Sequence, residues 1–239
     1  MKFYDLHVHS KFSSGDSSPA EIAAMAEQLG ISAVGICDTF QGMEKLMEIK
    51  KSIAEVKSSV ELIQGVYIVA QNVDEMKNIL SKVRNEVAVL IVAGGDYNIN
   101  RAACSDSRVD ILAHPELGRT DNGLDEVCLA AARENNVAIQ INFRQILNSY
   151  RRTRSHILNY MRINARLCDS LNVPLVVCSG AHSKWEMRDG RELVAIANLL
   201  GLDIPKAFET VTSIPEKIVE INKKKLSGQI VTEGVEIEE

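Results

Sequence analysis

The sequence lacks several features that define large classes of protein. It contains no run of about 18 apolar residues and no signal-peptide pattern at its start, so we expect a cytoplasmic protein with no membrane partner. Its five cysteines are scattered and form no C-x-x-C pair, which argues against a disulfide framework and against a structural zinc ribbon. Aromatic residues make up only 5% of the chain, too few for a platform on which successive bases of a single strand would stack.

The chain also lacks a net positive charge. The formal net charge is -5 and the pI is about 5.6, so the overall field repels a polyanion, and any contact with nucleic acid must come from local basic patches. Internal repeats, low-complexity segments and Gly/Ser-rich linkers are absent as well, and the composition is typical of one large globular domain. We expect this domain to span residues 1–228, followed by an acidic tail, residues 229–239, that is frayed or adds a strand.

Short β-rich runs alternate with longer helical patterns along nearly the whole chain, which is typical of parallel strands joined by helical crossovers. The first strand is expected at about residues 3–6, and the longest helical pattern covers residues 149–172. The sequence therefore predicts a TIM-like α/β barrel with about seven parallel strands and surrounding helices, with a doubly wound open sheet as the alternative. The seven predicted strands are the runs DLH, SAVGIC, LIQGVY, VAVLIV, DILA, VAIQIN and PLVVCS.

Four of the five histidines fall just past the carboxyl ends of predicted strands, the end at which active sites form in parallel barrels. Neutral imidazoles bind zinc, manganese or iron well, and an H-x-H pair puts both side chains on one side of an extended segment. Any single one of them is more simply a partly buried histidine that bonds a carbonyl, but four at corresponding positions indicate a common site. These four are His7, His9, His114 and His182; His156, inside the long helix, is interpreted as a surface or packing residue.

The motifs DLHVHS, AHP at residues 113–115 and AHS at residues 181–183 resemble the polymerase-and-histidinol-phosphatase (PHP) superfamily of metal-dependent phosphoesterases, which have a distorted seven-stranded barrel. The resemblance implies a further ligand histidine, glutamate and aspartate, at positions where this chain has Phe40, Tyr67 and Gly180. A cluster of two or three dications needs carboxylates to offset its charge, so we expect no catalytic metal cluster. A single zinc on three histidines remains chemically possible, which leaves the four histidines as vestigial metal candidates.

A second resemblance is more specific. The segment GGDYNINRAACSDSRVDILAHPE and the stretch from INFRQILNSYRRTRSHILNY to LVAIANLLGL are similar to the ribonuclease P protein component 3 family, over nearly all of residues 85–215. That family consists of barrel-shaped subunits of archaeal and eukaryotic ribonuclease P and also resembles the phosphoesterase barrels without a full metal cluster. Both resemblances then have one explanation, in which the phosphoesterase outline is kept and its chemistry is lost.

The second resemblance implies a protein subunit of ribonuclease P, the ribonucleoprotein endonuclease that removes 5′ leaders from precursor tRNA. Catalysis would belong to the RNA subunit and its Mg²⁺, with no catalytic residue and no cofactor in the protein itself. The implied partners are ribonuclease P RNA, precursor tRNA, ribonuclease P protein component 2 and other ribonuclease P proteins.

Basic residues follow several predicted strands and open the long helix. Arginine suits RNA because its planar guanidinium bonds phosphates through two N–H groups and stacks on bases. The plainer interpretation of the helical arginines is a solvated face paired with carboxylates. The candidates for RNA or partner contacts are Arg101, Arg144, Arg151, Arg152, Arg154, Lys184 and Arg188.

Two other functions stay open at this point. One is a free-standing phosphoesterase that uses the four histidines with Asp5 or Asp38 as a carboxylate ligand. The other is a cytoplasmic barrel with an unassigned small-molecule site.

Overall fold

The computed structural model of the protein describes residues 1–232 and 235–236. Seven strands form one sheet in the order of the chain, and each pairs in parallel with the next. The strands are β1 (Tyr4–Val8), β2 (Ala33–Ile36), β3 (Glu61–Ile68), β4 (Val89–Ala93), β5 (Ile111–Ala113), β6 (Ala138–Asn142) and β7 (Leu175–Cys178).

The sheet curves until its first and last strands meet. Val8 at the end of β1 bridges to Ala181 beyond β7, and the N–H of His9 donates to the Ala181 carbonyl at 2.8 Å. The prediction of a nearly closed seven-stranded barrel is confirmed, and the open doubly wound alternative is wrong because that sheet would have two free edges. β1 also runs two residues further than expected, so His7 lies inside the strand rather than after it.

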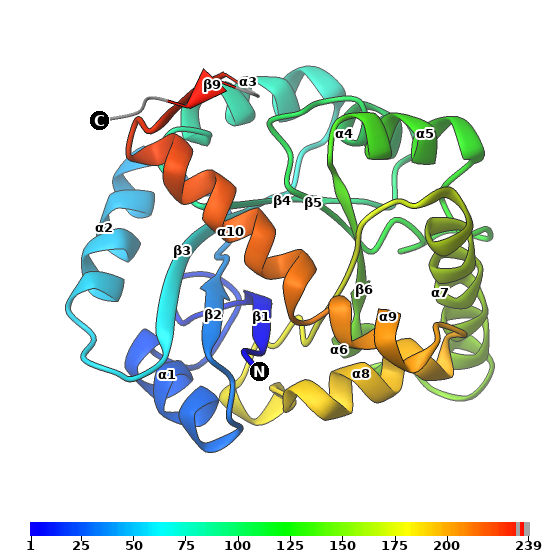
Figure 1. Ribbon diagram of the computed structural model, residues 1–239, viewed down its shortest axis with the longest axis horizontal. Helices are drawn as coiled ribbons and strands as arrows, with labels where there is room; N and C mark the ends of the chain where they lie inside the picture. The colour runs from blue at the N-terminus through cyan, green and yellow to red at the C-terminus, as the bar shows by residue number, and fades with distance from the viewer. Residues whose placement is uncertain (233–234, 237–239) are drawn as a thin grey trace.

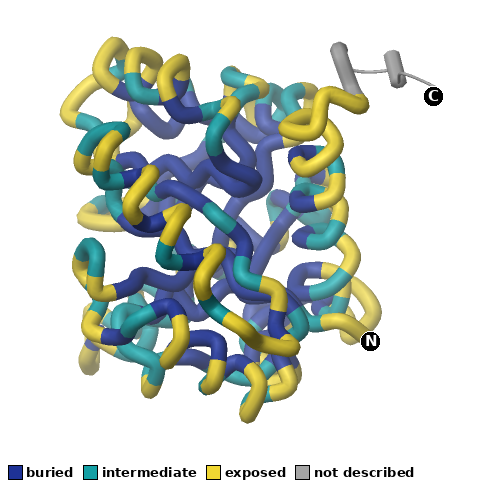
Figure 2. Tube along the Cα trace, turned by 90° about the vertical axis from the view of Figure 1, so that its left-hand side faces the viewer, coloured by how far each residue is buried: buried dark blue, intermediate teal, exposed yellow. Residues whose placement is uncertain are grey.

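Helices connect the strands and surround the barrel, as Figure 1 shows. Strands β2, β4, β5 and β7 are continuous apolar runs, as expected of strands buried on both faces, whereas β1, β3 and β6 also carry polar residues. One core cluster joins side chains of all seven strands to Val219. Figure 2 shows this buried interior beneath the exposed outer sides of the helices. The helices are α1 (Pro19–Gln28), α2 (Met43–Ala54), α3 (Val73–Val83), α4 (Tyr97–Cys104), α5 (Glu126–Glu134), α6 (Phe143–Leu147), α7 (Arg151–Leu171), α8 (Gly190–Leu199), α9 (Ile204–Glu209) and α10 (Ser213–Leu226), with a 3-10 turn at Lys184–Glu186.

Helix α10 covers the amino end of the barrel and crosses in front of the strands in Figure 1. The hydroxyl of Tyr4 in β1 donates to Glu216, and the Asn222 amide donates to the Ala88 carbonyl just before β4 and to Asp110 just before β5, at 2.9 and 2.7 Å. With α10 at the amino end, the carboxyl ends of the strands form the other end of the barrel.

Two segments differ from the expectation. The short helix α6 separates β6 from α7, which begins at Arg151 rather than at residue 149. The predicted acidic tail lies partly outside the described residues; its described part forms an antiparallel pair, β8 (Ile230–Thr232) and β9 (Val235–Glu236). In the part of the chain that the structure describes, no helix has the length and apolar character that crossing a membrane requires.

Candidate functional site

The four histidines meet at the carboxyl end of the barrel. His7 and His9 point to the same side of β1, and their Nε2 atoms lie 3.1 Å apart. His182 packs on His9 with ring centroids 4.4 Å apart, and His114 joins the group through Tyr67, whose hydroxyl lies 2.7 Å from His114 Nε2. The predicted convergence of the histidines is therefore confirmed.

Hydrogen bonds and rings hold the histidines in place. Nδ1 of His7 lies 3.0 Å from the side-chain oxygen and 2.9 Å from the side-chain nitrogen of Gln140 in β6. The Tyr67 ring contacts those of His7 and His9 at centroid distances of 4.9 and 5.2 Å. Tyr67 thus lies at the centre of an aromatic cluster, a role that the sequence analysis did not assign to it.

All four imidazoles are kept neutral. Burial lowers the pKa of His7 to about 3 and that of His114 to about 4, because a charged imidazole loses its hydration there. Burial also lowers the pKa of His9 and of His182, and the nearby Arg144 guanidinium lowers both further. Near pH 7 the cluster therefore carries no charge of its own.

The two carboxylates of the phosphoesterase hypothesis accept hydrogen bonds from the protein, although Oδ2 of Asp5 has no partner among the described residues. Asp38 accepts hydrogen bonds from the Ser10 N–H at 2.8 Å and from the Ser10 and Ser13 hydroxyls at 2.5 Å. Asp5 is fully buried and accepts from the Ser179 N–H at 3.1 Å, and burial raises its pKa to about 6. Neither carboxylate is arranged to bridge metal ions.

The residues at this end of the barrel do not fit the metal cluster that the phosphoesterase fold implies. Phe40 and Tyr67 supply no carboxylate or imidazole, and a phenol whose pKa is raised by burial stays protonated. Gly180 has φ +62°, and a Cβ added there would collide with the Asn142 amide, so an aspartate does not fit at this position. Among the described residues, no group of three or more His, Cys, Asp or Glu side chains is arranged to hold a metal ion.

The histidines form the wall of a cavity of about 550 Å³, called here the histidine cavity. Several of its polar atoms have no hydrogen-bond partner within the described part of the protein: Nδ1 of His114, Oδ1 of Asn142 and both amide atoms of Gln145. His114 and Asn142 are only 5% and 6% exposed. The cavity is lined by His7, His9, Ser14, Tyr67, His114, Leu117, Asn142, Arg144, Gln145, Asn148, Ser149, Tyr150, Thr153, Ile157, Gly180 and His182.

Of the predicted basic residues, two are engaged in ion pairs. Arg144 lines the histidine cavity, and its Nε donates to Glu186 at 3.0 Å. Lys184 pairs with Glu21 at 2.9 Å. Their charges are therefore partly offset within the protein.

The arginines that open α7 adjoin Tyr150 and Thr153, which line the histidine cavity. Tyr150 lines the cavity, is 73% exposed and directly precedes the helix. Arg151 and Arg152 are exposed, while Arg154 donates to the Ser149 carbonyl at 2.8 Å and lies over the Tyr150 ring. None of the three forms an ion pair with a described residue.

The other two predicted residues are held differently. Arg101 is exposed on α4 and donates to the Tyr97 hydroxyl at 3.1 Å, away from the histidine cavity lining. Arg188 lies over the Phe143 ring at 5.0 Å and donates to the Met187 carbonyl at 2.7 Å. Phe143 follows β6 directly, so Arg188 belongs to the same end of the barrel as Arg144.

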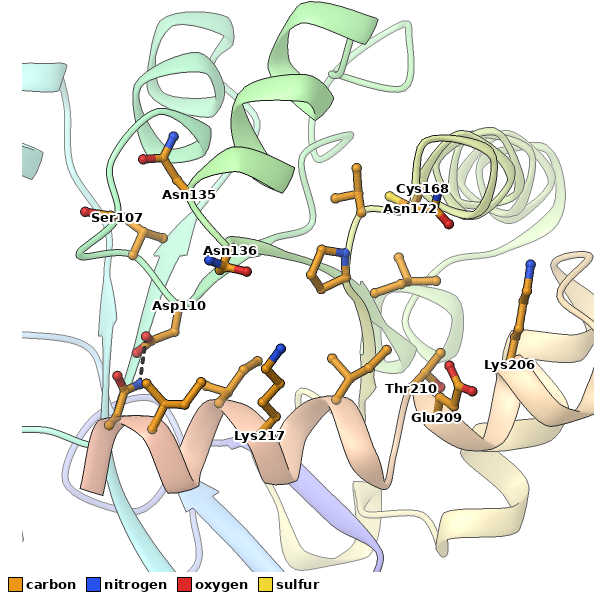
Figure 3. A pocket seen from close by; sticks show the side chains of 18 of the residues that line it. Ser107, Asp110, Asn135, Asn136, Cys168, Asn172, Lys206, Glu209, Thr210 and Lys217 are labelled. Carbon is orange, nitrogen blue, oxygen red and sulfur yellow. Dashed lines mark hydrogen bonds between the residues drawn. The ribbon is translucent and has the colours of Figure 1, made fainter. Parts of the chain in front are cut away.

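A second cavity, of about 690 Å³, lies at the amino end between α10 and the segments that precede β5, β6 and β7. Figure 3 shows Lys206 and Lys217 beside it, and Asp110 hydrogen-bonded within it. Asp110 accepts from Asn222 and Arg84, both at 2.7 Å. None of the buried side-chain atoms found without a partner in the described residues belongs to this cavity.

The sequence analysis did not predict that the side-chain amides of Asn142 and Gln145 line the cavity. Asn142 and Gln145 lie in INFRQ, a segment selected for its arginine, and an isolated amide has no motif that would mark it. Glu116, in the AHPE segment, was missed as well. It is 3% exposed, both of its oxygens lack a partner among the described residues, and burial raises its pKa to about 7.

Comparison with known proteins gives a consistent result. The family model RNase P subunit p30 matches residues 2–227. Ribonuclease P protein component 3 of Methanosarcina barkeri is 34% identical over 236 residues, covering 99% of this chain and 95% of the relative. The corresponding protein of Methanococcoides burtonii is 35% identical over 237 residues, covering 98% and 93%.

Solved structures agree. A chain in the cryo-EM structure of archaeal ribonuclease P with mature tRNA is 26% identical, with a TM-score of 0.81 over 97% of this chain and 96% of that one. The histidinol phosphate phosphatase of Lactococcus lactis, complexed with zinc, L-histidinol and phosphate, has a TM-score of 0.55 at 13% identity over 92% of this chain and 94% of that one. The second likeness shows the fold alone.

Proposed function

The chain belongs to the RNase P subunit p30 family, and from this premise we propose that it is a protein subunit of ribonuclease P, the endonuclease that removes 5′ leaders from precursor tRNA. The observation that carries the proposal is the correspondence of the whole barrel, from end to end, with a chain of archaeal ribonuclease P. The cytoplasmic location expected from the sequence is part of the same proposal.

In this function the protein supports the chemistry without performing it. The RNA subunit, with its Mg²⁺, hydrolyses the phosphodiester, and the protein lowers the repulsion between catalytic RNA and substrate. The proposed partners are ribonuclease P RNA, precursor tRNA, ribonuclease P protein component 2 and the other ribonuclease P proteins. This division of labour is supported by the positions of Phe40, Tyr67 and Gly180, which supply none of the ligands that a metal cluster would need beside the neutral histidines.

The proposed RNA-facing surface is the carboxyl end of the barrel. Arg151 and Arg152 are its strongest candidates because both are exposed and form no ion pair with a described residue. Arg144 and Lys184 are paired with carboxylates and must exchange those partners to bind phosphate. The proposed contacts to RNA or protein partners are Arg101, Arg144, Arg151, Arg152, Arg154, Lys184 and Arg188.

Reconstitution tests the proposal. The protein is mixed with the cognate catalytic RNA and component 2, and assembly is followed by native gel while precursor tRNA cleavage is timed. We expect a shifted complex and faster cleavage than without the protein. Absence of both effects, from a protein that is folded by circular dichroism, would contradict the proposal.

The phosphoesterase alternative makes the opposite prediction. It requires the isolated protein to hydrolyse p-nitrophenyl phosphate when Mn²⁺ or Zn²⁺ is added. Because both oxygens of Asp38 are bonded to Ser10 and Ser13, and no described group of three or more His, Cys, Asp or Glu side chains is arranged to hold a metal ion, we expect no turnover above that of the metal alone.

A further inference from the structure

The histidine cavity has hydrogen-bonding capacity that the protein leaves unused. Oδ1 of Asn142 is an acceptor, the Gln145 amide is both donor and acceptor, and Nδ1 of His114 is either, depending on its tautomer. A buried polar group without a partner is unfavourable because it has lost its bonds to water, so four such atoms around one cavity favour a polar ligand that satisfies them. The amino-end cavity offers no such atoms among its described residues, although it is larger.

The histidine cavity offers little free positive charge for an anionic ligand. Arg144 is the single Arg, Lys, Asp or Glu residue among the described residues that line it, and its guanidinium is paired with Glu186. The histidines beside it are neutral near pH 7. A neutral ligand with donors and acceptors along its edges therefore fits better than a phosphate group.

The volume and the aromatic lining of the histidine cavity suit a heterocycle. Its volume of about 550 Å³ falls in the range of roughly 300–1,000 Å³ that is usual for small-ligand sites. The rings of His7, His9 and Tyr67 contact one another in its lining, which also includes the amides of Asn142 and Gln145. Single-stranded RNA is recognised in this way, by stacking on aromatic rings and hydrogen bonds to base edges.

The mouth of the histidine cavity suits a nucleic-acid backbone. Tyr150, at the mouth, is followed by Arg151 and Arg152, and α7 begins there without a side-chain cap on its first N–H groups. The positive end of the helix dipole and two exposed arginines thus lie where a strand would pass.

We propose that the histidine cavity receives one unstacked nucleobase of an RNA strand whose phosphates cross the arginines at the start of α7. This inference rests on the proposed function for its source of RNA. The same chemistry would accept the base of a free mononucleotide, and the experiment distinguishes the two sources.

Crosslinking in the assembled particle tests the inference. Catalytic RNA and precursor tRNA are each prepared with 4-thiouridine or 6-thioguanosine, assembled with the protein and component 2, and irradiated. We expect a crosslink from a single nucleotide to the peptide that spans residues 142–150. Crosslinks that map only outside the cavity lining, or only to a protein partner, would overturn the inference while cleavage stimulation still supported the proposed function.

A matched pair of variants identifies the hydrogen bonds. Gln145→Leu removes an amide that has no partner in the described protein, so the fold should tolerate it, and we expect the crosslink yield to fall about tenfold. Gln64→Leu is the control, because its side-chain oxygen is also unpartnered but lies outside the histidine cavity lining. Equal effects of the two variants would assign the loss to general destabilisation and overturn the inference.

Titration with the four nucleoside monophosphates covers the second source. The isolated protein is titrated with each, and the imidazole signal of His114 is followed by NMR. Saturable shifts without a crosslink to RNA would assign the cavity to a free nucleotide. Neither shifts nor crosslinks, in a particle that assembles and cleaves, would overturn the inference and leave the proposed function standing.

Discussion

Tyr67 occupies the position at which the phosphoesterase superfamily places a glutamate, and its hydroxyl bonds Nε2 of His114. A glutamate there would offset metal charge, whereas the buried phenol stays neutral. Gly180 likewise leaves the site without a carboxylate, because the Asn142 amide occupies the space that an aspartate would need. The sequence showed both replacements. It did not show the hydrogen bond between Tyr67 and His114, because the two residues are 47 positions apart in the chain.

Removing one hydroxyl tests this arrangement. Tyr67→Phe leaves His114 with no side-chain partner on either nitrogen, so we expect the unfolding free energy to fall by about 1–3 kcal/mol. Tyr160→Phe, which removes an exposed hydroxyl bonded to the Thr120 carbonyl, should cost less than about 1 kcal/mol. Urea denaturation of both variants decides the matter, and equal losses would contradict the account.

Glu116 gives a pH dependence of known sign. Burial raises its pKa from 4.5 to about 7, so the folded state binds a proton more tightly than the unfolded state. Its contribution to stability is present below pH 4.5 and is lost as the pH rises through 7. Glu116→Gln should therefore be more stable than the parent by a margin that grows between pH 4.5 and 8 to at most about 3 kcal/mol.

The measurement is denaturant unfolding of both proteins across that pH range. A constant margin, or one that shrinks as the pH rises, would show that the Glu116 carboxyl is already ionised in the folded protein.

Among the elements, α7 combines the features with the clearest functional meaning. Its length was predictable because Met161, Ala165 and Cys168 recur at helical spacing on its buried side. Its first turn holds three arginines and no acidic residue, opposite to the preference set by the helix dipole. The short helix α6 was not predicted because five residues are too few to show a periodic pattern.

The arginines of α7 are expected to act on RNA at little cost to the fold. Arg151→Ala/Arg152→Ala removes repulsion at the positive helix end, so stability should stay level or rise by roughly 0.3–1 kcal/mol for each charge. RNA affinity should fall, and the slope of log affinity against log salt should drop by roughly 0.7–0.9 for each lost phosphate contact.

The control is Lys51→Ala/Lys82→Ala, which removes the same charge from exposed positions on α2 and α3. RNA affinity is measured for both double variants by filter binding at several salt concentrations. If both pairs lower the slope equally, the effect belongs to net charge and not to α7.

At the scale of the whole molecule, the barrel was predictable because seven short β-rich runs, most of them apolar, alternate with helical patterns along the chain. The convergence of the four histidines was predictable from the barrel, since the carboxyl ends of parallel strands lie at one end of it. Closure was part of the same prediction, but the residues that make it were not predicted, because Val8 and His9 bond to Ala181, which lies more than 170 positions further along the chain. The histidine cavity was not predictable either, since its amides carry no sequence motif.

The magnesium dependence of precursor tRNA cleavage tests the central claim most directly. The cognate RNA and component 2 are assayed over a range of Mg²⁺ concentrations in three mixtures: without the protein, with the parent protein and with its Asp5→Asn variant. The asparagine resembles a protonated aspartic acid, and burial already favours the protonated form of Asp5. We predict that the parent and the variant lower the Mg²⁺ concentration for half-maximal cleavage equally, by several-fold. We also predict that neither protein cleaves precursor tRNA when the catalytic RNA is left out. Cleavage by the protein alone, or loss of the effect in a folded Asp5→Asn variant, would contradict a subunit that leaves catalysis to RNA.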